Sequence, residues 1–173
     1  SVWQLPVLFC IENNGYGLST PTSEQYNCEN LADRALGYGM ESHIIDGNNI
    51  LEVYTKVNAL AEEMRENPRP VLLEFKTFRM RGHEEASGTK YVPDDLMETW
   101  AQKDPLENYK KYLVGLGLLT DEMDEDMASQ IKETIQENLD LAYNEDAIVP
   151  HLETELEDVY APFTYQDTPP TEA

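Results

Sequence analysis

The sequence predicts an α/β fold, in which a parallel sheet flanked by helices is followed by a helical C-terminal region. Three short segments, at residues 5–11, 40–46 and 71–78, have the length and composition of strands. Helical patterns separate them, and this alternation is typical of a parallel, right-handed α/β unit. After residue 93 the apolar residues recur at helical spacing.

Length and charge narrow the class of protein. A chain of 173 residues with 40% hydrophobic content can form a globular domain with its own core. The formal net charge of −22 disfavours nucleic acid as a partner, because phosphates would be repelled. No apolar run approaches the ~20 residues that a membrane-spanning helix needs, so we expect no membrane association.

The two cysteines, Cys10 and Cys28, provide neither a disulfide framework nor a paired zinc spacing. This fits a reducing cytoplasm, and we expect a cytoplasmic protein. The first residues contain no basic and apolar leader and precede a strand directly. We therefore expect this chain to begin in the middle of a domain and to be a fragment of a longer subunit.

The first predicted strand is the apolar run at residues 5–11, which we expect to be fully buried, with Cys10 as a small core residue. It ends at Asn13, Asn14 and Gly15. Parallel sheets bind ligands at the carboxyl ends of their strands, so these polar residues stand where a functional site is expected. The alternative is an ordinary tight turn, because Asn-Gly is a strong turn signal.

Two helices and two strands follow in order. Residues 27–38 are predicted to be a helix, and residues 40–46 a strand. The clearest helix spans residues 50–67, with Asn49 as its N-cap, and a third strand follows at residues 71–78. The first helix is expected to present an apolar face of Leu31, Ala32, Ala35 and Leu36.

The loop at residues 79–93 breaks this pattern, because it has no apolar period. Long loops without regular structure are often functional. It follows a strand, so we expect it at the same sheet edge as Asn14. Arg79, Arg81 and His83 could hold a phosphate there, although the arginines could also be ordinary surface charges.

The two loops together predict a metal site beside an anion site. Asparagine and main-chain oxygens in the first loop suit magnesium or calcium and are poor ligands for zinc. A magnesium-bound diphosphate would use both loops. His83 is either a lone polar loop residue or a group that transfers protons near neutral pH. Glu84 and Glu85 are interpreted as solvated loop residues rather than an acid–base pair.

The C-terminal region is predicted to contain helices at residues 94–102 and 106–114 and a long helix capped by Thr120. From residue 149 prolines and acidic residues indicate an extended arm or linker. We thus expect an α/β part at residues 1–93, a helical part at 94–148 and an arm at 149–173. Residues spaced four apart on the long helix indicate core or subunit contact: Met123, Met127, Ile131, Ile135 and Leu139.

Residues 5–21 resemble the second half of the thiamine diphosphate motif, which ends at an Asn-Asn pair. Residues 78–91 are similar to the histidine-bearing loop of the same family, and residues 46–49 and 103–106 match further landmarks. The family is the α subunit of the decarboxylating component of 2-oxo acid dehydrogenase complexes. The similarity extends to about Leu141 and identifies residues 1–93 as the C-terminal half of a thiamine-diphosphate-binding α/β domain.

The resemblance implies a role for each candidate residue. Asn14 would ligate Mg²⁺ through its side chain and Tyr16 through its main-chain carbonyl, while Leu18 would pack against thiamine diphosphate. Arg79 would contact the diphosphate. His83 would lie beside the reactive ring, bind the cofactor and act in acyl transfer to lipoamide. The implied reaction is oxidative decarboxylation of a 2-oxo acid, with the branched-chain, 2-oxoisovalerate type favoured over pyruvate or acetoin.

Two departures from the family pattern have consequences. The Gly-Asp-Gly half of the motif is absent, so we expect this fragment alone to bind the cofactor poorly and to be inactive. Glu84 replaces a phosphorylatable serine, which indicates a bacterial type without that control. The implied partners are a β subunit, or a β half fused after the tail that begins near Val159, and a lipoyl-bearing acyltransferase. A non-catalytic acidic interaction module is the alternative.

Overall fold

The computed structural model describes residues 1–84 and 86–162. It divides into two compact units, Ser1–Thr120 and a second that begins at Asp121. We describe each unit by itself. The domain boundaries predicted at residues 93 and 148 remain predictions.

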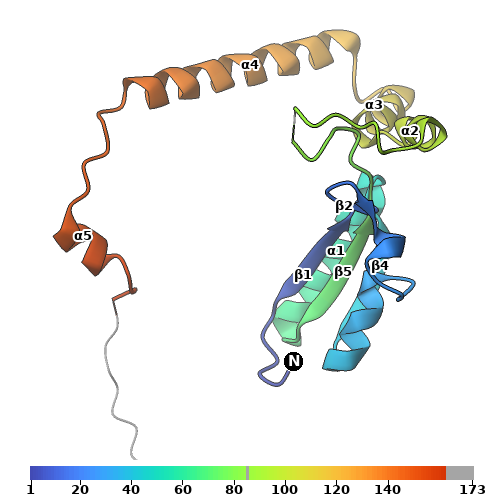
Figure 1. Ribbon diagram of the computed structural model, residues 1–173. Coiled ribbons are helices and arrows are strands. Elements are labelled where there is room, and N and C mark those ends of the chain that lie inside the picture. The colour runs from blue at the N-terminus through green and yellow to red at the C-terminus, as the bar shows by residue number, and fades with distance from the viewer. Residues whose placement is uncertain (85, 163–173) are drawn as a thin grey trace, which may run out of the picture. The chain divides into compact units, whose positions relative to one another are not determined.

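The first unit is built on a three-stranded parallel sheet (Figure 1). Its strands are β1 (Leu8–Asn13), β4 (Glu41–Asp46) and β5 (Val71–Lys76), in the order β1-β5-β4. This confirms the predicted α/β class and the three strands. Asn13 and Asp46 both lie opposite Lys76, so all three strands end at the same edge.

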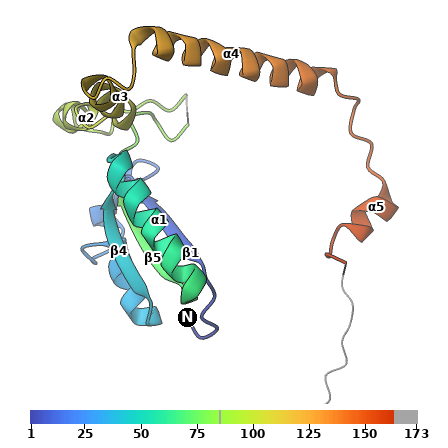
Figure 2. The same ribbon diagram turned by 180° about the vertical axis from the view of Figure 1, so that it is seen from behind.

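Helices cover the two faces of this sheet. Helix α1 (Ile50–Glu66) lies behind the sheet in Figure 1 and in front of it in Figure 2. The 3₁₀ helix η2 (Leu31–Tyr38) packs on the other face. The Asn49 side chain accepts a hydrogen bond from the Glu52 N–H at 3.3 Å, which confirms the predicted N-cap. The α1 side of the core contains Ile45, Leu60, Met64, Val71 and Leu73, and the η2 side contains Ala32, Ala35 and Leu72.

The expectation that the first strand is fully buried is wrong. In β1, Phe9 is 49% exposed and Cys10 is also exposed, so Cys10 is not a core residue. The physical reason is position: β1 is an edge strand, with β5 as its only neighbour in the described sheet. Cys10 and Cys28 are both free thiols.

Helix η2 also differs from its prediction. It begins at Leu31 instead of residue 27, where the Asp33 carboxylate accepts a hydrogen bond from the Asn30 N–H at 2.9 Å. A 3₁₀ helix has three residues per turn, so Ala32 and Ala35 share the buried face. Leu36, expected on that face, is 86% exposed because it is one residue out of this period.

The polar segment after β1 forms a short hairpin, in which β2 (Tyr16–Gly17) pairs with β3 (Thr20–Pro21) before the 3₁₀ turn η1 (Thr22–Glu24). Farther along, α2 (Asp94–Ala101) and α3 (Pro105–Gly115) confirm two predicted helices. Asp104 caps α3 by accepting hydrogen bonds from the N–H groups of Leu106 and Glu107.

The second unit contains α4 (Asp121–Asn144), the predicted long helix, and α5 (Leu152–Glu157). Helix α5 lies in the segment expected to be an extended arm, of which residues 163–173 are outside the described structure. The predicted apolar row on α4 is 44–60% exposed, so it is not a core of its own unit. Within the described residues, no helix combines the length and apolar character needed to span a membrane.

An ion-pair network fastens β4 to the end of α1, far along the sheet from the strands' carboxyl edge. Arg69 Nε donates to Glu41 Oε2 at 2.7 Å, and its Nη2 donates to Glu63 Oε2 at 2.6 Å. His43 Nε2 lies 2.6 Å from the other Glu41 oxygen. The hydrogen bonds from Arg69 and His43 hold the pKa of the Glu41 carboxyl below its usual value.

We predict that Glu41→Gln lowers the thermal unfolding midpoint at neutral pH. The folded-state pKa of Glu41 is depressed, so its stabilising contribution is present above the unfolded-state pKa of about 4.3 and is lost as the pH falls through the folded value. The difference from wild type should therefore shrink below about pH 4. Glu62→Gln, at an exposed pair with Arg65, is the control. A Glu41→Gln effect that is constant from pH 7 to pH 3 would contradict this account.

Candidate functional site

The two loops predicted to meet do meet at the carboxyl edge of the sheet. Arg79, which follows β5, donates from Nη2 to the Leu18 carbonyl at 2.7 Å. The same nitrogen donates to the Tyr91 hydroxyl at 3.1 Å, and Arg79 Nε donates to the Arg81 carbonyl at 3.1 Å. Arg79 is thus fixed from three directions, and Leu18 is held in a left-handed conformation with φ of 57°.

The turn after β1 is shaped by two consecutive asparagines. The Gly15 N–H donates to Asn13 Oδ1 at 3.1 Å, and the Tyr16 N–H donates to Asn14 Oδ1 at 3.0 Å. Gly15 has a φ of 79°, which glycine adopts without strain. The Asn14 side chain is therefore folded over the backbone of Tyr16.

These oxygens fit a hard cation. An amide oxygen has two lone pairs, and the N–H of Tyr16 occupies one of those of Asn14. The Thr22 N–H donates to the Gly15 carbonyl at 2.9 Å, so Tyr16 and Pro21 form a non-hydrogen-bonded pair, and the Tyr16 carbonyl faces away from the other strand of the hairpin. Two oxygen donors of the type that Mg²⁺ prefers thus lie within one turn. Among the described residues, no cluster of three His, Cys, Asp or Glu side chains offers a different kind of metal site.

Aromatic rings hold the loops and α2 together. The Tyr16 ring contacts Tyr91 edge-on at a centroid distance of 5.7 Å and Phe78 at 6.3 Å. Phe78 in turn stacks on Trp100 of α2 at 5.4 Å. Such pairs add about 0.5–1.5 kcal/mol beyond the burial of their area. Sequence reasoning missed Tyr91, which contacts both Tyr16 and Arg79.

Four of the five predicted site residues line two clefts that the Tyr16–Tyr91 contact joins. Asn14 and Tyr16 line one of about 340 Å³, and Leu18 and His83 line the other, of about 370 Å³. His83 is exposed and shares its cleft with Glu84 and Ser87. Arg79 lines neither cleft but donates to Leu18 and Tyr91, which both line the second one. Glu85 lies outside the described residues.

Glu74, in the middle of β5, is the polar residue that sequence reasoning missed. Its side chain is fully buried and accepts hydrogen bonds from Asn13 Nδ2 at 2.7 Å and from the Ala32 N–H at 2.7 Å. Lys76 Nζ donates to it at 2.6 Å. Burial raises the pKa of the Glu74 carboxyl, but these hydrogen bonds outweigh it and hold the pKa below its usual value. A carboxylate between buried apolar neighbours in a strand was the available signal, because a buried charge must be paired.

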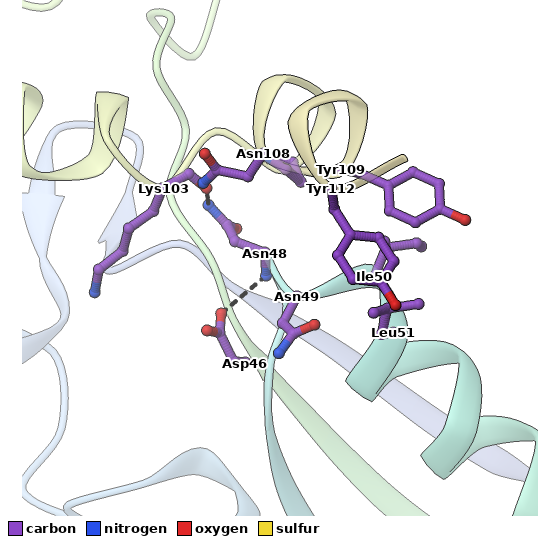
Figure 3. A pocket seen from close by; sticks show the side chains of 10 residues that line it. Asp46, Asn48, Asn49, Ile50, Leu51, Lys103, Asn108, Tyr109 and Tyr112 are labelled. Atoms are coloured by element: carbon purple, nitrogen blue, oxygen red, sulfur yellow. Dashed lines mark hydrogen bonds between the residues drawn. The ribbon is translucent and has the colours of Figure 1, made fainter. Parts of the chain in front are cut away.

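A separate pocket of about 290 Å³ lies where β4 ends (Figure 3). Asn48 Nδ2 donates to the Lys103 carbonyl at 2.7 Å, and Thr77 Oγ1 donates to Asn48 Oδ1 at 3.0 Å. Asn48 therefore connects the segments after β4, after β5 and before α3. None of the five predicted site residues lines this pocket, whose walls include Asp46, Tyr109 and Tyr112. We interpret this pocket as part of the contact that holds α3 near the sheet edge.

The chain is similar in sequence to one family of known proteins. Residues 1–151 match the family described as "Dehydrogenase E1 component". The chain is 38% identical over 162 residues to the 2-oxoisovalerate dehydrogenase subunit alpha of Bacillus subtilis, covering 93% of this chain and 48% of the relative. It is 35% identical to the alpha subunit of the acetoin:2,6-dichlorophenolindophenol oxidoreductase of the same organism, with 94% and 48% covered.

A third relative is the pyruvate dehydrogenase E1 component subunit alpha of Zymomonas mobilis, which is 34% identical over 137 residues. That match covers 77% of this chain and 39% of the relative. The chain thus spans about half the length, or less, of the curated relatives it matches.

We predict that Arg79→Gln loosens both loops, because it removes the hydrogen bonds to the Leu18 carbonyl and the Tyr91 hydroxyl. Amide hydrogen exchange should become several-fold faster in peptides that cover residues 16–20 and 86–93. Lys90→Gln, at an exposed position of the same loop, is the control and should leave exchange near residue 18 unchanged. Unaltered exchange in Arg79→Gln would show that the loops do not depend on this side chain.

Proposed function

Because this chain belongs to the dehydrogenase E1 component family, we propose that it is the α-subunit part of a thiamine-diphosphate-dependent 2-oxo acid dehydrogenase. The proposed reaction is oxidative decarboxylation of a 2-oxo acid with acyl transfer to lipoamide. The observation that carries the proposal is the hydrogen bond from Arg79 to Leu18, which brings an anion-binding side chain to the loop that contains Asn14 and Tyr16. The chain spans about half of its relatives, so the activity is proposed for the full-length assembly.

The oxygen donors of the first loop would hold Mg²⁺: Asn14 through its side chain and Tyr16 through its carbonyl. Leu18, 58% exposed at the cleft, would pack against thiamine diphosphate. When bound, this cofactor supplies the nucleophilic carbon at which a 2-oxo acid loses carbon dioxide. The guanidinium of Arg79 has five N–H groups, so after its contacts with Leu18, Tyr91 and Arg81 it keeps donors for a diphosphate.

His83 is the proposed catalytic residue of this chain. Its imidazole is exposed at the cleft that Leu18 also lines, so it can meet both a bound cofactor and a group delivered from outside. An imidazole can hold or release a proton near neutral pH. We assign it the proton transfer that accompanies delivery of the acyl group to lipoamide.

Among substrates we propose a branched-chain 2-oxo acid of the 2-oxoisovalerate type. The support is the 38% identity to a protein named for that substrate, against 35% and 34% for proteins named for acetoin and pyruvate. Pyruvate or acetoin is therefore the second candidate. 2-Oxoisovalerate and pyruvate differ in the acyl side chain, whereas acetoin is a hydroxyketone without a carboxylate. Comparing kcat/KM for the three in the full assembly decides among them.

The proposed partners are a β subunit, or a fused β half, and a lipoyl-bearing acyltransferase. Support comes from α4, whose apolar row is exposed within its own unit. Acidic side chains surround this row, and Lys132 is the only basic residue of the helix. A second copy of α4 would bring like charges together, so a partner with a basic rim fits better. A cytoplasmic location remains a prediction.

The cofactor site is tested by calorimetric titration of thiamine diphosphate and Mg²⁺ into the full-length assembly. Asn14→Ala removes one oxygen ligand and should weaken Mg²⁺-dependent binding tenfold or more, about 1.4 kcal/mol. Asn27→Ala, at an exposed asparagine outside the turn, is the matched control and should bind as wild type. If the intact wild-type assembly binds no cofactor, the enzyme proposal fails and the acidic interaction module becomes the better account.

The partner surface is tested by Ile131→Asp, which places a charge in the middle of the apolar row. It should weaken association with the β partner at least tenfold in analytical ultracentrifugation, because the carboxylate would be desolvated in the contact. Ser129→Asp adds the same charge on the opposite face by helical periodicity and should have little effect. Equal effects of the two variants would show that the row is not the contact.

A further inference from the structure

We propose that Glu74 is a positioning residue that fixes the Asn13–Gly15 turn and so presets the oxygen donors of Asn14 and Tyr16 for a divalent cation. This inference rests on the proposed function for the identity of the cation site. That a buried carboxylate controls the turn is argued only from contacts within this chain. Glu74 does not line either cleft, so it would act through Asn13.

Three donors from three elements converge on this carboxylate. Asn13 from the end of β1 and Lys76 from β5 both donate to Oε1, and the Ala32 N–H at the start of η2 donates to Oε2. Glu74 is fully buried, so water cannot replace any of these partners. The carboxylate has no hydrogen to donate, and it therefore dictates that each group facing it is a donor.

This requirement sets the orientation of the Asn13 amide. With Nδ2 directed at Glu74, the Asn13 oxygen faces the other way and accepts the Gly15 N–H at 3.1 Å. The same turn carries Asn14, whose oxygen accepts the Tyr16 N–H. A reversed Asn13 amide would place an NH₂ group against the Gly15 N–H and break the turn. Glu74 thus selects the rotamer of Asn13 that closes the turn.

A purely structural role for Glu74 would not need a carboxylate. A buried ionic group is often no more stabilising than apolar residues of similar volume. Leu72 occupies the same face of β5 two residues earlier and packs against Ala32 and Ala35 without any polar group. The Glu74 carboxylate differs from an apolar residue because it fixes which way the Asn13 amide points. Asn13 directly precedes Asn14, the proposed cation ligand.

The experiment exploits this directionality with three variants of the full-length assembly. Glu74→Gln keeps the shape but leaves one uncharged oxygen to accept from the three donors of Asn13, Lys76 and Ala32, so Asn13 is held less strongly and the turn should loosen. Asn13→Asp alone would place two carboxylates together. In the double variant, the carboxylate introduced at position 13 can accept from both the amide introduced at position 74 and the Gly15 N–H. Lys76 lies opposite position 13 and can balance the new charge, so the double variant should rescue the turn.

Two readouts follow the cation and the turn separately. Mg²⁺ is titrated by calorimetry at saturating thiamine diphosphate, and amide exchange is measured in peptides that cover residues 13–17. Glu74→Gln should weaken Mg²⁺ binding at least tenfold and speed this exchange by a similar factor. The double variant should recover most of both. Glu41→Gln is the matched control, since it removes a hydrogen-bonded carboxylate from the far end of the neighbouring strand.

The outcomes separate the two proposals. Wild-type Mg²⁺ binding and exchange in Glu74→Gln would overturn this inference. So would a loss that Glu41→Gln reproduces at an equal drop in melting temperature, because the effect would then be general destabilisation. If wild type binds Mg²⁺ no better than Asn14→Ala, the proposed cation site fails, and the exchange data alone decide whether Glu74 controls the turn.

Discussion

A buried carboxylate must find hydrogen-bond donors within the protein, and the structure of the first unit follows how Glu74 meets this demand. Its donors come from the end of β1, from β5 and from the start of η2. One side chain in the central strand therefore links the edge strand, the helix on one sheet face and the turn that carries Asn14. The apolar residues on the other face of β5, Val71 and Leu73, pack against α1 independently. The α1 face of the sheet therefore holds most of the apolar core, whereas the hydrogen bonds of Glu74 on the η2 face orient the Asn13 side chain.

The register of the three strands brings the loops of the candidate site to the same edge of the sheet. Because Asn13 and Asp46 lie opposite Lys76, the loops after all three strands start from one level. Arg79 and Asn48 then fix those loops by bonding to main-chain carbonyls, of Leu18 and Lys103, which do not depend on the identity of those residues. The exposed His83 stands at the open side of this arrangement.

Much of this arrangement followed from local rules in the sequence. Short apolar segments, the Asn49 cap and the proline stop after α1 predicted the strands and the main helix, because these signals act over a few residues. That the two loops meet followed from parallel topology alone. The burial of Cys10 was mispredicted because composition does not reveal that β1 is an edge strand of the described sheet. The exposure of Leu36 was missed because a 3₁₀ helix shifts the buried period. Glu74 and Tyr91 were overlooked because their importance comes from partners far away in sequence.

In the proposed site, the Asn14 turn, preset by Glu74, holds a divalent cation beside Arg79. The most direct measurement is a crystal structure of the full-length assembly with thiamine diphosphate and Mn²⁺ in place of Mg²⁺, with the metal located by anomalous scattering. The account predicts a metal peak at bonding distance from Asn14 Oδ1 and the Tyr16 carbonyl oxygen, with Asn13 still bonded to Glu74. A metal bound at the edge without either oxygen, or a turn rebuilt so that Asn13 leaves Glu74, would contradict it.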